Sequence, residues 1–298
     1  MMANRKKLKS PYPSSLLIPA AILYIVLFFL PTIVSLFFSL TRWTLQEWQY
    51  IGFENFRLYF REEYLRIGFQ NTIIYAVVTS GMKVILAIYL ASFLTSKLRT
   101  TGFMRSALFF PTLVSTIGVG IMFVELLNPF GGIINRGITL VAGWFGYFTE
   151  GPGWLIDPNL LPILSIAAVD IWKGVGIATL LYIAGIAAIP KELYEAASVD
   201  GASARRQFYS ITIPLARPAM FSIIILSFVG GLRSFDLIWA MTGGGPGFIS
   251  DVLASINYKQ YTSGYYGLAT AGNVILFVLV SILVFPLYRY LSKREVAM

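Results

Sequence analysis

The chain of 298 residues contains no cysteine and no histidine. Without cysteine there are no disulfides, thiol nucleophiles or thiolate metal ligands, and without histidine there are no imidazole ligands or histidine proton relays. Charged residues are also scarce, at 12% of the chain, which is about half of their usual share in soluble proteins. These absences exclude several classes of enzyme and leave little room for a soluble domain.

Hydrophobic residues are abundant instead. They make up 57% of the chain, and the mean hydropathy is +0.72, which predicts a membrane protein. The net charge of +9 would favour a nucleic-acid partner in a soluble protein. In a protein with several membrane spans, an excess of Lys and Arg more often lies in cytoplasmic loops beside the anionic inner leaflet. We therefore predict the lipid bilayer as a partner and no nucleic acid.

Six apolar segments are long enough to cross a bilayer. The first follows a basic tail that contains Arg5, and its apolar stretch is too long for the core of a signal peptide, so a retained helix is predicted. Pro19 and Pro31 lie inside this segment and are expected to kink it. The predicted fold is an all-α membrane protein with six transmembrane helices, at residues 15–40, 69–96, 103–127, 160–188, 218–240 and 266–290.

The distribution of Lys and Arg predicts the orientation of these spans. The N-terminal tail, the loops 97–105 and 189–217, and the C-terminal tail together carry 14 of them, and the three other connecting segments carry 6. By the positive-inside rule both termini are cytoplasmic. The segment 41–68 fits least well, because it holds four arginines on the outer side.

The longest cytoplasmic loop, residues 189–217, contains the polar stretch "ELYEAASVDGASARRQFYSITIP". Pro190 precedes a helix predicted over residues 191–199, and Gly201 suits a reversal that needs positive φ. A second helix is predicted from 203 to 212, ended by Pro214 and Pro218. Small side chains on the first helix would let another protein approach closely. Taken alone, the shape fits an interfacial helix that caps the bundle equally well.

The same stretch resembles the EAA loop of binding-protein-dependent ABC importer permeases. That pattern is EAA, three residues, Gly, nine residues, Ile, any residue, Leu and Pro. The chain matches it at Glu195, Ala196, Ala197, Gly201, Ile211 and Pro214, with Ile213 in place of leucine. The stretches "NTIIYAVV", "WKGVGIATLLYIAGIAAIPKELYEAASVDGA", "FDLIWAMTGGGP" and "YGLATAGNVILF" extend the resemblance over residues 69–290. They are similar to the carbohydrate branch of the family, and the TGGGP segment resembles its larger permease subunit.

The resemblance implies the ABC type I importer fold and a mechanical role for the loop. In the family, this loop docks in a cleft of a separate nucleotide-binding subunit. The partners implied are a second homologous permease subunit, two ABC ATPase subunits and an extracytoplasmic sugar-binding protein, in a bacterial or archaeal cytoplasmic membrane. The coupling residues that the resemblance assigns are Glu195, Ala196, Ala197, Asp200, Gly201, Ile211 and Pro214.

No nucleotide site is predicted in this chain. The sequence contains no GxxxxGK[ST] motif, which is the loop that cradles ATP phosphates. ATP and magnesium are therefore expected on the partner ATPase, and no cofactor is expected here. Three regions are predicted: residues 1–68 with the first span, a permease core at 69–290, and a tail at 291–298.

Transport sites tend to lie near the middle of the bilayer, and two predicted helices carry polar or small residues at that depth. Helical spacing places each group on one face. The predicted substrate pathway consists of Asp170, Lys173, Gly174 and Ile177 on the fourth span and Ser227, Gly230 and Gly231 on the fifth. A different explanation is equally open: Asp170–Lys173 and Arg233–Asp236 as ion pairs, and the glycines as helix-packing positions.

Two other classes of function, an ion-coupled carrier and a membrane enzyme, fit the sequence less well. An ion-coupled carrier would not need a docking loop, and a membrane enzyme would need a catalytic set that the sequence lacks. If the chain is an importer permease, a neutral oligosaccharide is the favoured substrate. Lys83 and Lys173 leave an acidic or phosphorylated sugar open, such as glycerol phosphate or a uronic-acid oligomer.

Overall fold

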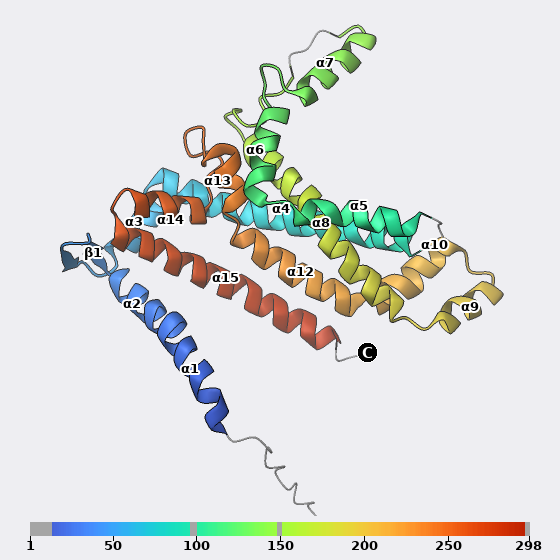
Figure 1. Ribbon diagram of the computed structural model, residues 1–298, viewed down its shortest axis with the longest axis horizontal. Coiled ribbons are helices and arrows are strands. Elements are labelled where there is room, and N and C mark those ends of the chain that lie inside the picture. Colours follow the sequence, from blue (N-terminus) through green and yellow to red (C-terminus); the bar gives the residue numbers. More distant parts are fainter. Residues whose placement is uncertain (1–13, 96–99, 148–150, 296–298) are drawn as a thin grey trace, which may run out of the picture.

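The computed structural model describes residues 14–95, 100–147 and 151–295. Four helices are long and apolar enough to cross a membrane, and two bent helix pairs raise the number to as many as six. The elongated bundle carries α9 and α10 at one end and the β-hairpin with α3 and α14 at the other (Figure 1). We call these the α9 end and the hairpin end. The basic residues of the N-terminal tail and the last three residues lie outside the described ranges.

The first span stands apart from the rest of the bundle. It consists of η1 (Ser14–Leu17), α1 (Ile18–Tyr24), the π turn η2 (Ile25–Phe29) and α2 (Leu30–Phe38). None of its apolar residues is buried by the chain itself, and it projects away from the other helices in Figure 1. The π turn lies just before Pro31, where the proline removes a backbone donor.

A small cap follows at the hairpin end. Strand β1 (Thr41–Trp43) pairs antiparallel with β2 (Trp48–Tyr50), and α3 (Glu54–Arg61) packs beside them. The buried amide of Asn55 donates hydrogen bonds to the carbonyls of Ser39 at 2.9 Å and Thr41 at 2.8 Å. Helix α4 (Glu63–Leu94) then crosses the bundle. It begins earlier than residue 69, where the sequence placed its start.

The third predicted span, 103–127, is not one straight helix. It is split into α5 (Thr101–Leu113) and α6 (Thr116–Leu126), which meet at 96°. Pro111 lies in the last turn of α5, and Val114 and Ser115 are extended, with ψ of 142° and 131°. Helix α7 (Ile133–Trp144) follows and projects from the bundle (Figure 1). Helix α8 (Leu161–Ala187) returns through the bundle and confirms the fourth span.

The polar loop folds as α9 (Lys191–Val199), α10 (Ala204–Gln207), the π turn η3 (Phe208–Thr212) and α11 (Ile213–Leu215). The prediction that Pro214 ends the second helix is wrong. The π turn lies just before Pro214, so the helix continues through the proline. The break comes at Ala216, where the chain bends by 66° into α12 (Arg217–Leu232). Pro218 lies in the first turn of α12, a position at which proline is tolerated.

The fifth predicted span, 218–240, is also interrupted. Helix α12 ends at Leu232, and α13 (Asp236–Thr242) starts after a short break. Helix α14 (Leu253–Thr262) then packs at the hairpin end, and α15 (Tyr266–Glu295) runs back along the bundle as the last span. Because Arg233 and Asp236 lie on either side of the break, they do not share a helix, and the predicted helical ion pair between them is absent from the described salt bridges.

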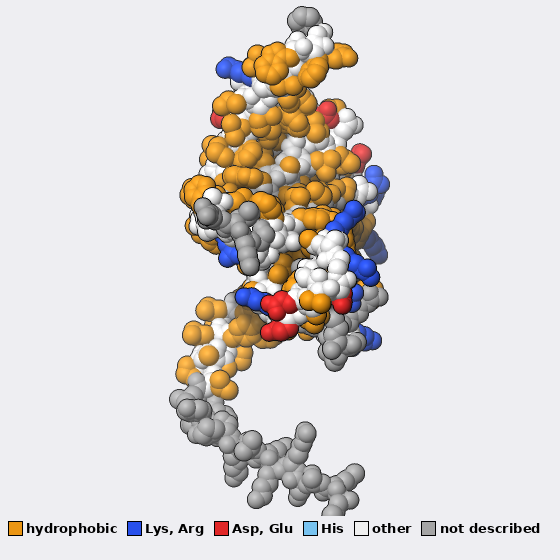
Figure 2. All heavy atoms as spheres, turned by 90° about the vertical axis from the view of Figure 1, so that its right-hand side faces the viewer, with side chains coloured by type: hydrophobic (Ala, Val, Ile, Leu, Met, Phe, Trp, Pro, Cys, Tyr) orange, Lys and Arg blue, Asp and Glu red, His pale blue; other side chains and the backbone are white. Residues whose placement is uncertain are grey.

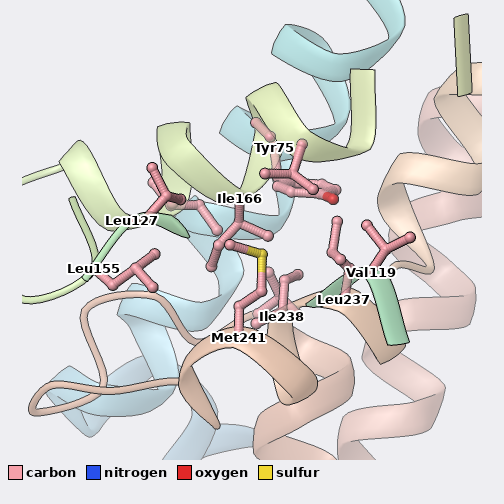
Figure 3. Close-up of a cluster of buried hydrophobic side chains, with 12 residues drawn as sticks. Tyr75, Val119, Leu127, Leu155, Ile166, Leu237, Ile238 and Met241 are labelled. Atoms are coloured by element: carbon pink, nitrogen blue, oxygen red, sulfur yellow. The ribbon is translucent and has the colours of Figure 1, made fainter. Parts of the chain in front are cut away.

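Helices α4 and α8 form the centre of the bundle, and three buried apolar clusters surround them. One of these joins Tyr75 of α4 and Ile166 of α8 to Val119 of α6 and to Leu237, Ile238 and Met241 of α13 (Figure 3). It lies beside the breaks between α5 and α6 and between α12 and α13. The interrupted helices are therefore held by packing, and they bring loop backbone into the middle of the protein.

Candidate functional site

The first candidate site is the corner formed by α9, Gly201 and α10. Gly201 has a φ of +74°, a conformation that glycine adopts without strain. The amide of Gln207 donates to the Ser198 hydroxyl at 2.9 Å and to the Ala202 carbonyl at 3.1 Å. The hydroxyls of Tyr194 and Thr212 lie 3.0 Å apart. These contacts fix the two helices relative to each other.

The loop presents a large open surface. Figure 2 looks at the α9 end and shows acidic and basic side chains gathered there. Glu195, Ala196 and Asp200 are exposed, and Val199 is 88% exposed. Ala197, Ile211 and Pro214 are half-buried. The outer face of α9 is therefore uncovered by the rest of the chain, with charged, small and apolar side chains side by side.

The second candidate site lies inside the bundle, where Asp170 meets a lysine that the sequence analysis did not pair with it. The ammonium of Lys83 on α4 lies 2.7 Å from Oδ2 of Asp170 on α8. No salt bridge joins Asp170 to Lys173 among the described residues. The predicted Asp170–Lys173 pair is therefore wrong. Asp170 and Lys173 are three residues apart on α8 and could have paired. The ammonium of Lys83, from the neighbouring helix α4, contacts Asp170 instead.

Lys173 points to a different neighbour. Its ammonium lies 3.4 Å from the Thr112 carbonyl, and the Thr112 hydroxyl donates to the Lys173 carbonyl at 2.9 Å. Both contacts lie beside the break between α5 and α6. Lys173 thus ties α8 to the broken helix. It contacts a carbonyl dipole, and no described salt bridge gives it a carboxylate partner.

The three predicted glycines have three different surroundings. A Cβ at Gly174 would lie 2.7 Å from Cε of Lys83, so this glycine makes room for the lysine. A Cβ at Gly231 would lie 2.7 Å from Cα of Ala76 and 2.9 Å from the Thr79 hydroxyl, so Gly231 is a packing position between α12 and α4. A Cβ at Gly230 would have no neighbour within 4 Å. Of the three, only Gly230 faces open space, like the half-buried Ser227 and the exposed Ile177.

Helix α4 contributes a polar stripe that the sequence analysis missed. Tyr75, Thr79 and Lys83 repeat every fourth residue and therefore share one face. Tyr75 and Thr79 are fully buried, and their hydroxyls have no hydrogen-bond partner in the described part of the chain. Asp170 and Ser234 lie next to the Tyr75 hydroxyl. The sequence shows that these three residues share a face of the helix, but it does not show that this face packs toward α8.

The TGGGP segment forms a tight loop between α13 and α14. Gly243 and Gly244 have φ of +57° and +86°, and a Cβ at Gly244 would overlap the carboxylate of Asp251. Asp251 is fully buried and receives hydrogen bonds from Lys259 at 2.6 Å and Ser255 at 2.7 Å. Burial raises the pKa of Asp251, and these two hydrogen bonds oppose the shift. The segment is a structural turn held by the buried carboxylate.

Broken helices inside an apolar bundle, with charged and unpaired polar groups at the breaks, are characteristic of membrane transport proteins. The exposed helical corner at one end adds a place for a partner to act on the bundle. The model of the family described as "Binding-protein-dependent transport system inner membrane component" matches residues 83–296. The chain belongs to this family and is a permease subunit of an ABC importer, not an enzyme.

Relatives cover almost the whole chain. It is 30% identical over 298 residues to the multiple sugar-binding transport system permease protein MsmF of Streptococcus mutans, covering 98% of this chain and 99% of that one. It is 31% identical to the sn-glycerol-3-phosphate transport system permease protein UgpA of Agrobacterium fabrum, covering 95% of each.

A solved structure has the same fold. A chain of a bacterial ABC transporter involved in the import of the acidic polysaccharide alginate superposes with a TM-score of 0.80 over 94% of each chain, at 22% identity. The likeness extends over the broken helices and the polar loop together, since so little of the chain is left out. The predicted importer fold is confirmed.

Proposed function

We propose that this chain forms one half of the pathway of an ATP-driven saccharide importer and is driven through the corner of α9, Gly201 and α10. The observation that carries this proposal is the corner itself. It is a rigid, exposed helical pair with the EAA pattern, and it is joined directly to α8 and α12. A displacement of α9 would therefore be transmitted to α8 and α12, the two helices that carry the proposed pathway residues.

The roles proposed at the corner follow from exposure and conformation. Glu195 is acidic and exposed, so it can pair with a cation of the ATPase. Ala196 and Ala197 have small side chains, so the ATPase can approach the helix closely. Gly201 supplies the reversal, with Asp200 before it. Ile211 and Pro214 hold the second helix against the bundle. ATP and magnesium would bind to the partner ATPase subunits, and this chain itself would need no cofactor.

The proposed substrate pathway uses the surface of α8 and α12 that this chain leaves uncovered. Asp170 can accept hydrogen bonds from sugar hydroxyls, and Ser227 and Gly230 border open space on α12. Tyr75 and Thr79 lie behind this surface, and their buried hydroxyls would become available only if α4 and α8 move apart. Three assigned residues have other roles: Gly174 and Gly231 shape the site through packing, and Ile177 offers an apolar surface.

The proposed assembly has several partners. A single chain provides half of a pathway, so we propose a second, related permease subunit, two ATPase subunits and an extracytoplasmic binding protein. The α9 end is proposed to face the cytoplasm, with both termini on that side of a bacterial or archaeal cytoplasmic membrane. The binding protein would then approach the hairpin end.

An acidic or phosphorylated sugar is the second candidate substrate, and Lys173 is the observation that favours it. Asp170 neutralises Lys83, so Lys173 is left to supply positive charge near the breaks. A neutral saccharide needs no such charge. Uptake of sn-glycerol 3-phosphate or an oligouronate, measured beside neutral oligosaccharides, distinguishes the two.

The test of the proposed function is uptake by the purified complex in proteoliposomes, with its binding protein and a panel of labelled saccharides. Glu195→Lys and Gly201→Asp should each reduce ATP-driven uptake at least tenfold. The first reverses a charge at the docking surface, where like charges cost several kcal/mol, on the order of tenfold or more in coupling. The second puts a side chain at a position with positive φ.

The matched control is Glu47→Lys, which reverses an exposed carboxylate at the hairpin end. This variant should keep the ATPase subunits bound and retain basal ATPase activity at the wild-type level. Normal saccharide-stimulated ATPase activity in both Glu195→Lys and Gly201→Asp would rule out the proposed coupling role.

A further inference from the structure

A cavity of about 840 Å³ lies under α7, but a second one, behind the α9–α10 corner, has the more informative chemistry. Its volume is about 700 Å³. Its walls come from the ends of α4, α5 and α8 on one side and from α9, α10 and η3 on the other. The cavity therefore separates the corner from the bundle that the corner moves.

The cavity is basic. Arg105 of α5 and Lys191 of α9 line it from opposite sides, and its described lining residues include no carboxylate. Two cations without a counter-ion inside one cavity repel each other, and a bound anion would remove this repulsion. The two acidic residues of α9, Glu192 and Glu195, are exposed and do not line the cavity.

Arg105 has an unused donor. Its Nη2 donates to the Leu94 carbonyl at 2.9 Å, which fixes the guanidinium at the end of α4. Its Nε is buried and has no hydrogen-bond partner among the residues that the structure describes. A buried donor without a partner costs free energy, and a bound anion would offset part of this cost by pairing with the guanidinium charge. The guanidinium is a planar donor that suits phosphate and carboxylate oxygens.

Hydroxyl groups surround the two cations. Ser92 and Thr95 lie near the end of α4, and Tyr194 and Thr212 form a pair on the corner. The remaining wall is apolar and includes Ile183 and Ile186 of α8. Cations and hydroxyls from both walls, next to the aliphatic side chains of α8, match a phosphate ester that carries an apolar group.

We propose that this cavity binds a phosphate group and that the ligand bridges Arg105 of the bundle and Lys191 of the corner. The chemistry is shared by the headgroup of an anionic phospholipid and by a soluble phosphate. Basic pockets between helix ends at the cytoplasmic surface are suited to anionic headgroups. Because the ligand contacts both sides of the cavity, its binding would stiffen the connection through which the corner moves α5 and α8.

The test is ligand binding to the purified, delipidated transporter complex, measured by native mass spectrometry and thermal shift. The probes are phosphatidylglycerol, phosphatidylcholine and inorganic phosphate. The wild-type complex should bind phosphatidylglycerol at least tenfold more tightly than Lys191→Gln or Arg105→Gln, since each variant loses a charge-assisted hydrogen bond. Arg206→Gln is the control, because Arg206 is an exposed cation of the same corner outside the cavity.

The probes distinguish the two sources of phosphate. Competition by inorganic phosphate at millimolar concentration identifies a soluble ligand, and binding of phosphatidylglycerol alone identifies a lipid. Equal binding by all variants, or an equal loss in Arg206→Gln, would overturn the proposal. Lys191 is exposed, so Lys191→Gln remains informative if Arg105→Gln does not assemble. The readout is binding, so it stands whether or not the complex imports a saccharide.

Discussion

Gly231→Leu is expected to prevent assembly of the transporter. A Cβ at this position would already lie 2.7 Å from the Cα of Ala76, and a leucine would push α12 away from α4. Overpacking of this kind costs typically ~1–3 kcal/mol, and more where backbone has to move. The yield of folded complex, measured by size-exclusion chromatography after affinity purification, should fall several-fold or more.

The neighbouring Gly230→Leu provides the matched comparison. No atom lies within 4 Å of a Cβ at Gly230, so the leucine has room in the folded protein. This variant should assemble at the wild-type level and retain basal ATPase activity, but it should lose saccharide uptake because its side chain fills the open pathway. Failure of Gly230→Leu to assemble, or normal uptake by it, would contradict the assignment of Gly230 to the pathway.

Breaking the Lys83–Asp170 pair should have the second large effect. Lys83→Met leaves the carboxylate of Asp170 without its partner in a bundle where the two side chains are 11% and 24% exposed. Removing one member of a buried pair costs roughly 3–5 kcal/mol, and the partial exposure of Asp170 places the expected loss near the lower value. The midpoint of thermal inactivation of the purified complex should fall, and less protein should reach the membrane.

The double variant Lys83→Met with Asp170→Asn distinguishes pairing from other roles. It leaves no uncompensated charge, so assembly should return toward the wild-type level. The exchange of Lys83→Asp with Asp170→Lys should also restore assembly, whereas Asp170→Lys with Lys173→Asp should not. Rescue by the second exchange and not by the first would show that Asp170 pairs with Lys173 in the working protein.

Much of the helical arrangement was predictable from local sequence. The apolar runs indicated six spans, and Gly201 together with the polar residues around it indicated the corner and its first helix, α9. These features depend on composition, on spacing and on backbone preferences at single positions. The breaks were not predictable in the same way. Val114 and Ser115 are ordinary residues, yet their backbone is extended, and α6 packs against α13 just beyond them.

The interior of the bundle was harder to predict than its spans. Asp170 and Lys173 share a helix face, so their spacing suggested a pair, but the rotation of α4 places Lys83 closer to Asp170. Gly230 and Gly231 are adjacent in the chain and point to different neighbours. The stripe of Tyr75, Thr79 and Lys83 was visible as a pattern. Its meaning depends on which helix it faces, and helical spacing carries no information about that.

Docking of a partner ATPase on α9 can be tested directly by crosslinking, because of the composition of the chain. It contains no cysteine, so Val199→Cys introduces a single thiol at a position that is 88% exposed on α9. Trp48→Cys introduces one at the hairpin end, where Trp48 is 57% exposed. Each thiol can be labelled with a maleimide photo-crosslinker in membranes that contain the whole transporter, and the adducts identified by mass spectrometry. An ATPase adduct is expected from Val199→Cys and none from Trp48→Cys. No ATPase adduct from Val199→Cys, or equal adducts from both positions, would contradict docking on α9.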